Sequence, residues 1–162
     1  FRKAVNIGTS DFDIEQRIDF HSGSGFDVFA GYIAVSDAQG GIIALAGPAD
    51  PSSGFAGIKR LTITDGQCDN YAGDKDTYHE YGRREELQLE NSFRRSNNVY
   101  RIQRIGGVLK VSVDGKEIFQ KVDDRSVQYV NMLANRHHTS QVYGFGTLIF
   151  GPISMCYAGM SN

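Results

Sequence analysis

Residues 99–122 carry the local pattern that most restricts what this chain can fold into. Side chains alternate in character from Val99 to Ile105 and again from Leu109 to Val113, and Gly106-Gly107 separates the two runs. Alternation with a period of two is typical of strands with one face on a core. Gly106-Gly107 and Asp114-Gly115 suit two-residue turns, because type I′ turns need positive φ at both central positions. The pattern predicts a three-stranded antiparallel meander.

Other segments of the chain have the same strand-like character. Asp11 to Phe20 alternates between apolar and charged residues, and Val28 to Val35 is more continuously apolar, as in a strand covered on both faces. Gly40-Gly41 predicts a hairpin that pairs Ile42–Leu45 with the preceding strand. Further strands are expected at Leu61–Thr64, Val127–Leu133, Phe145–Phe150 and Ile153–Tyr157. The patterns add up to about eleven or twelve strands and no amphipathic helix.

Composition narrows the class of protein. The chain has 162 residues with 19 Gly, 10 Phe and 8 Tyr, and a net charge of −2. This near-balance of charge argues against a nucleic-acid partner, which usually requires a basic surface. We expect one domain over residues 1–162, all-β, a two-sheet antiparallel β-sandwich of jelly-roll type. Because residue 1 is Phe, we expect the chain to be processed or excised from a larger protein.

Two features bear on the compartment of the protein. The uncharged stretch from Tyr143 to Met160 is interrupted by four glycines and Pro152. Two strands joined at Gly151-Pro152 therefore explain it better than a membrane span, and we expect no membrane insertion. The only cysteines, Cys68 and Cys156, fit either one disulfide in an oxidising compartment or two buried thiols.

Four segments together resemble the concanavalin A-like lectin and glucanase superfamily, and its laminin-G-like domains in particular. Tyr100–Lys116 resembles the family's Arg-bearing strand, Gly turn and strand ending in Val-Asp-Gly, and Ile7–Ile14 looks like the start of its second strand. Gly41–Leu45 and Phe150–Ser154 are similar to two further strands. The resemblance implies a concanavalin A-like sandwich in a secreted or cell-surface protein. Lectins, adhesion modules, glycoside hydrolases and polysaccharide lyases share this fold, so function must be argued from a site.

The acidic residues of the sequence give only weak support for an enzymatic function. Glu86-Leu87-Gln88-Leu89-Glu90 has the spacing of the family's Glu-x-Asp-x-Glu glucanase motif, but Gln88 replaces the central Asp. A polar outer face of an edge strand explains this string more simply. Asp13 and Glu15 share a strand face with Arg17, which is typical of a solvated face of mixed charge. We expect a non-catalytic protein, with a polysaccharide hydrolase or lyase as an alternative.

The segment from Asp65 to Arg84 loses the apolar period and predicts a functional loop. Calcium binds six to eight oxygens from carboxylates, amides, carbonyls and water. The candidate calcium ligands in this loop are Asp69, Asn70, Asp74 and Asp76. A solvated acidic loop with Asx turns is the competing interpretation and the one we favour.

The same loop predicts a binding surface for a partner molecule. Aromatic faces suit the C–H side of a sugar, and arginines suit carboxylates. The predicted ligand-binding residues here are Tyr71, Tyr78, His79, Tyr81 and Arg83. A second loop is expected over 135–140, with Asn135 and His137 as candidates and two exposed imidazoles as the simpler reading. The expected partner is a glycan or glycoprotein; the alternative is a laminin-G-like adhesion domain that binds a surface or matrix protein.

Overall fold

A computed structural model describes residues 1–22, 28–47, 60–64, 84–88, 97–137 and 146–160, and these ranges contain eleven strands and no helix. The strands are β1 (Arg2–Gly8), β2 (Phe12–Ser22), β3 (Val28–Ser36), β4 (Ile42–Ala46), β5 (Arg60–Thr64), β6 (Arg84–Gln88), β7 (Asn98–Ile105), β8 (Val108–Val113), β9 (Lys116–Val122), β10 (Val127–His137) and β11 (Gly146–Tyr157).

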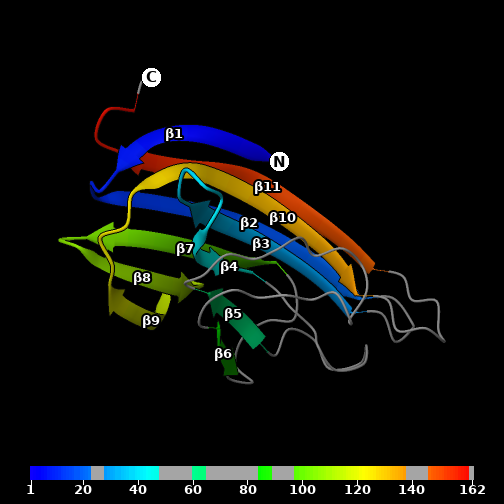
Figure 1. The fold of residues 1–162 in the computed structure, drawn as a ribbon. Coiled ribbons are helices and arrows are strands. Elements are labelled where there is room, and N and C mark those ends of the chain that lie inside the picture. The colour runs from blue at the N-terminus through cyan, green and yellow to red at the C-terminus, as the bar shows by residue number, and fades with distance from the viewer. Residues whose placement is uncertain (23–27, 48–59, 65–83, 89–96, 138–145, 161–162) are drawn as a thin grey trace.

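Two antiparallel sheets form the sandwich (Figure 1). One sheet has the strand order β1-β10-β3-β4 and the other the order β11-β2-β7-β8-β9. The β5–β6 pair forms a third, two-stranded sheet that contacts β4. The predicted all-β, two-sheet antiparallel sandwich is therefore confirmed.

The core lies between the two larger sheets and follows the predicted alternation. Phe12, Ile14 and Ile18 of β2 point inward, as do alternate residues of β7 and β8. They pack in one cluster with Ile33 and Val35 of β3. Burying each such side chain stabilises the fold by about 1.5–3 kcal/mol. The other face of β3 and β4 carries a second buried cluster, formed by Tyr32, Ala34, Ile42 and Leu45, as expected for a strand covered on both sides.

The predicted turns of the meander and the hairpin are confirmed. Gly106 and Gly107 have φ of 58° and 78°, and Asp114 and Gly115 have φ of 50° and 81°, as type I′ turns require. In the β3–β4 hairpin the Asp37 carboxylate accepts a hydrogen bond of 2.8 Å from the Gly41 amide. The meander and the hairpin therefore follow from local sequence.

Two predicted boundaries are wrong. The strands expected on either side of Gly151-Pro152 are one 12-residue strand, β11, with a register shift between Phe150 and Ile153. A bulge of this kind accommodates Pro152, which has no N–H for the ladder. The loop expected over 135–140 instead begins as strand, because β10 pairs with β3 as far as His137 opposite Val28. A long partner strand outweighs a locally polar sequence.

Two further findings concern membrane-spanning helices and the cysteines. No helix in the described part of the chain is long and apolar enough to cross a membrane. Among the described residues Cys156 is a free, exposed cysteine, and its disulfide with Cys68 stays a prediction. Cys68 itself lies outside the described residues.

Candidate functional site

The sandwich has two ends of different character. One, here called the turn end, carries the β1–β2 turn (8–11), the β3–β4 turn (37–41), the β7–β8 turn (106–107) and the β9–β10 connection (123–126). At the opposite end Ser22 pairs with Gly146, and His137 pairs with Val28. Figure 1 shows these strand ends together, away from the turns. The described ends of β2, β3, β10 and β11 therefore meet at this opposite end.

A buried arginine closes the turn end. Arg104 is 0% exposed and lies on the inward face of β7. Its guanidinium donates hydrogen bonds to the carbonyl oxygens of Gly8 (2.6 Å), Ser10 (2.8 Å) and Arg125 (2.6 Å). It also lies 5.2 Å from the centre of the Phe12 ring. One side chain thus joins β7 to the β1–β2 turn and the β9–β10 connection.

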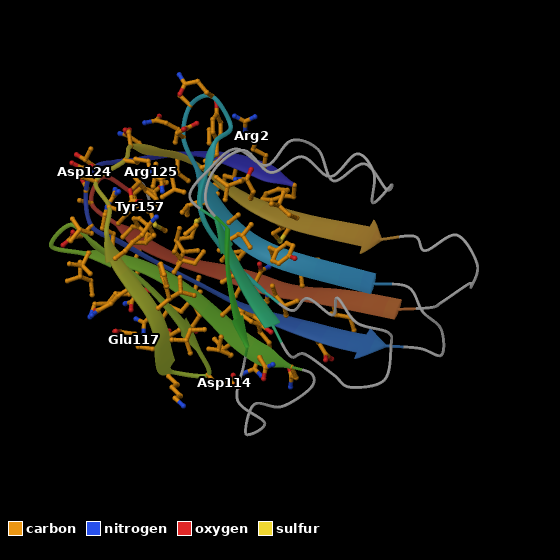
Figure 2. The ribbon with its side chains drawn as sticks, turned by 60° about the horizontal axis from the view of Figure 1, so that its bottom comes forward. Arg2, Asp114, Glu117, Asp124, Arg125 and Tyr157 are labelled. Carbon is orange, nitrogen blue, oxygen red and sulfur yellow. The ribbon has the colours of Figure 1, made fainter. Side chains whose placement is uncertain are left out.

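An aspartate in the same region is also satisfied internally. Asp123 accepts hydrogen bonds from the Arg125 side chain, the shortest of 2.6 Å, and an ion pair joins it to Lys121 at 3.6 Å. Burial acts to raise the pKa of Asp123, but the hydrogen bonds and charge of Arg125 outweigh burial and hold that pKa below its usual range. Figure 2 shows Asp124 and Arg125 at this end, away from Asp114. The contacts of Arg104 and Asp123 at the turn end are structural.

The outer face of the five-stranded sheet carries paired charges. Asp13 binds the Arg101 guanidinium through both carboxylate oxygens and accepts a third hydrogen bond from Gln103 (3.1 Å). The hydrogen bond from Arg101 holds the pKa of Asp13 below its usual range. A carboxylate held in this way does not serve as a general acid near neutral pH. The predicted face of mixed charge is confirmed for Asp13.

The main predicted binding segment lies outside the described residues, but its flanks are placed. Thr64, the last residue of β5, pairs with Arg84, the first residue of β6. The two flanks of residues 65–83 are therefore held side by side, and Arg84 is a strand residue rather than part of the predicted loop. The predicted residues outside the described ranges are Asp69, Asn70, Tyr71, Asp74, Asp76, Tyr78, His79, Tyr81 and Arg83.

The second predicted surface is partly placed. Asn135 and His137 occupy alternate positions of β10, where their backbones pair with Ala30 and Val28. They belong to a strand and not to a loop, and the strand ends at His137, at the end of the sandwich opposite the turns. This end therefore contains one of the two predicted surfaces.

The carboxylate string of the enzyme interpretation is described only in part. Glu86 and Gln88 lie on β6, where their backbones pair with Thr62 and Arg60, whereas Glu90 lies outside the described residues. Within the described ranges no group of three or more His, Cys, Asp or Glu residues is arranged to hold a metal. The predicted calcium ligands lie elsewhere, so calcium binding stays a prediction.

Sequence reasoning missed the polar residues of the interior. Gln16 and Arg104 are 1% and 0% exposed, although both are polar. Their burial could have been predicted from the alternation of the strands. Gln16 lies on the same strand face as Phe12 and Ile14, and Arg104 lies on the same face as Ile102. A polar residue at an apolar position of an alternating strand indicates a buried hydrogen-bonding role.

Comparison with known proteins shows the fold. No protein-family model matches the sequence, and no curated protein is significantly similar to it. The CBM2 module of the evolved Dit of Lactobacillus casei BL23 phage J-1 has a TM-score of 0.60 at 14% identity, over 92% of this chain and 66% of that one. Sheep galectin-11, solved with glycerol, has a TM-score of 0.56 at 10% identity, over 96% of each chain.

An enzyme has a similar structure. The marine PL7 alginate lyase of Zobellia galactanivorans has a TM-score of 0.55 at 13% identity, over 93% of this chain and 64% of the lyase chain. This chain thus spans just under two thirds of the length of the lyase and phage chains. At such identities the likeness concerns the fold alone: the chain is a concanavalin A-like β-sandwich.

Proposed function

We propose that this chain is a non-catalytic, lectin-like module that binds carbohydrate through the segments flanking its strands. The observation that carries the proposal is the likeness of nearly the whole chain to a galectin and to a module named CBM2, with 96% and 92% of this chain covered. Both solved structures are similar to this chain in fold, and the function is carried over by analogy. Secretion or display at the cell surface is part of the same proposal.

The charged residues of the described strands and turns support a carbohydrate-binding site that lies away from the turn end. Arg104 and Asp123 are occupied by contacts within the protein, and on the sheet face Asp13 is held by Arg101. Groups bound in this way have little hydrogen-bonding capacity left for a sugar hydroxyl. We therefore assign the ligand to the segment 65–83, between the paired ends Thr64 and Arg84, and to the end of β10.

Chemistry on that segment suits an acidic or neutral saccharide. Tyr71, Tyr78 and Tyr81 offer flat apolar faces, and Arg83 can bind a carboxylate in bidentate fashion. The comparison of calcium with EDTA tests whether a calcium ion assists binding through the candidate ligands Asp69, Asn70, Asp74 and Asp76. The proposed partner is thus a glycan or a glycoprotein.

A glycan array, probed in calcium and again in EDTA, tests the proposal. We expect binding of a defined saccharide class. Arg83→Ala should weaken that binding by about 10- to 100-fold, the equivalent of one charged hydrogen bond. Arg17→Ala is the matched control, because Arg17 is exposed on β2 and donates only to Asn97 among the described contacts. Absence of binding under both conditions, or equal effects of the two variants, would refute the proposal.

The lyase of the same fold motivates a second candidate, a polysaccharide hydrolase or lyase. Glu86, on β6, is the residue to test. Release of oligosaccharides that is lost in Glu86→Gln would favour this enzyme function over the lectin. Capture of a polypeptide that free sugars do not displace would instead favour the laminin-G-like adhesion domain.

A further inference from the structure

Two polar side chains meet inside the sandwich. Gln16 of β2 and Tyr100 of β7 are register partners, and both point into the core. They are 1% and 0% exposed. Residues directly opposite on antiparallel strands have Cβ atoms about 4.5–5.5 Å apart. Even so, neither Oε1 of Gln16 nor the hydroxyl of Tyr100 has a hydrogen-bond partner of good geometry among the described residues.

The orientation of the Gln16 amide is determined by its other contacts. Its Nε2 donates to the carbonyl oxygen of Gly151 at 2.7 Å and lies 3.0 Å from Sδ of Met132. A flipped amide would place two acceptor oxygens against each other at Gly151, so the nitrogen must face that carbonyl. The remaining atom of the amide, Oε1 of Gln16, is therefore an acceptor.

The neighbouring phenol supplies the complementary group. Tyr100 has a hydroxyl that can donate one hydrogen bond and accept others. Burial raises the pKa of this phenol, and the nearby Asn98 amide opposes the rise, so the proton stays on the oxygen at neutral pH. A buried acceptor and a buried donor thus lie on facing positions without a direct bond. Buried polar groups in folded proteins are almost always paired, with protein or with ordered water.

We infer that Gln16 and Tyr100 hold an ordered water molecule in the interior of the sandwich. The water donates to Oε1 of Gln16 and accepts from the Tyr100 hydroxyl, and the Asn98 amide lines the same face of β7. Since Nε2 of Gln16 reaches Gly151 on β11 and Met132 on β10, the water extends a polar network that ties both sheets together.

A crystal structure at high resolution and water–protein NOE spectra test this site in the full chain. We expect density for a water within about 2.6–3.2 Å of both oxygen atoms, and a cross-peak between water and the Gln16 side-chain amide. A direct Gln16–Tyr100 hydrogen bond, or a dry contact in the crystal together with no cross-peak, would overturn the inference.

Variants provide an independent test by the sign of a stability change. Tyr100→Phe should remove the water and lower the melting temperature, because Oε1 of Gln16 then loses its donor. If the site is dry, the same change deletes an unpaired hydroxyl and the melting temperature rises, which would contradict the inference. Tyr129→Phe is the control: the Tyr129 ring stacks on Arg2 at 3.4 Å, and its variant should keep the water. Should Tyr100→Phe fail to fold, the wild-type density and spectra still decide.

Discussion

Replacement of Arg104 by methionine should destabilise the whole domain. Methionine retains much of the side-chain volume but removes the guanidinium that binds the carbonyl oxygens of Gly8, Ser10 and Arg125. Hydrogen bonds to charged groups contribute about 1.5–3 kcal/mol each, which gives about 4.5–9 kcal/mol for three acceptors. Removing a buried cation recovers several kcal/mol of desolvation free energy. The expected net loss is about 3–5 kcal/mol.

A loss of that size is easy to measure. Domains of this kind unfold with a free energy of about 5–15 kcal/mol, so Arg104→Met would remove a fifth or more of it. The chain has 8 Tyr and no Trp, so urea unfolding is followed by far-ultraviolet circular dichroism and tyrosine fluorescence. Arg17→Met is the control and should change the unfolding free energy by less than about 1 kcal/mol, because Arg17 is exposed and binds only at the surface. A loss below about 1 kcal/mol for Arg104→Met would refute the reasoning about the turn end.

Three further predictions concern separate parts of the sandwich. The pKa of Asp123 is lowered from 3.8 in the folded protein, so ionised Asp123 stabilises the fold above pH 3.8. This stabilisation is lost as the pH falls through the lowered pKa. In Asp123→Asn the free energy of unfolding should therefore fall less steeply with acid than in the wild type. Gly47→Ala would bring a Cβ to 1.8 Å from the Gly31 carbonyl oxygen, so we expect loss of soluble folded protein, and wild-type yield would contradict the packing. Cys156 is free and exposed, so a thiol reagent should label it in the native protein at the rate of a small thiol; slow labelling that speeds up in denaturant would mean it is buried.

Local sequence determined most of the strands and the tight turns. The β7–β8–β9 meander is encoded by alternation and by turn dipeptides, whose glycines adopt the positive φ that they permit. Whether a segment forms a strand depends largely on residues close to it in the sequence, so it can be predicted before the tertiary structure is known. The two-sheet architecture also follows, because amphipathic strands must bury one face against another layer.

Pairing between distant segments decided the lengths of two strands. β10 continues through Asn135 to His137 because β3 supplies hydrogen-bonding partners opposite, and no local pattern reveals that partner. β11 passes Pro152 as one strand because β2 pairs with it on both sides of the bulge, at Phe150 and again at Ile153. Both departures from expectation have one physical reason: a backbone ladder to a remote strand outweighs local breakers and polar residues.

The candidate site was likewise predictable from the sequence only in part. Composition alone predicted the tyrosines and acidic residues of residues 65–83 as a binding segment, because their chemistry is a property of the residues themselves. Only the tertiary structure showed that Thr64 and Arg84 hold the two flanks of this segment together. Only it showed that Asp13 is occupied by Arg101, which lies 88 positions along the chain. Contacts between residues so far apart depend on strand order and register, which short-range periodicity does not encode.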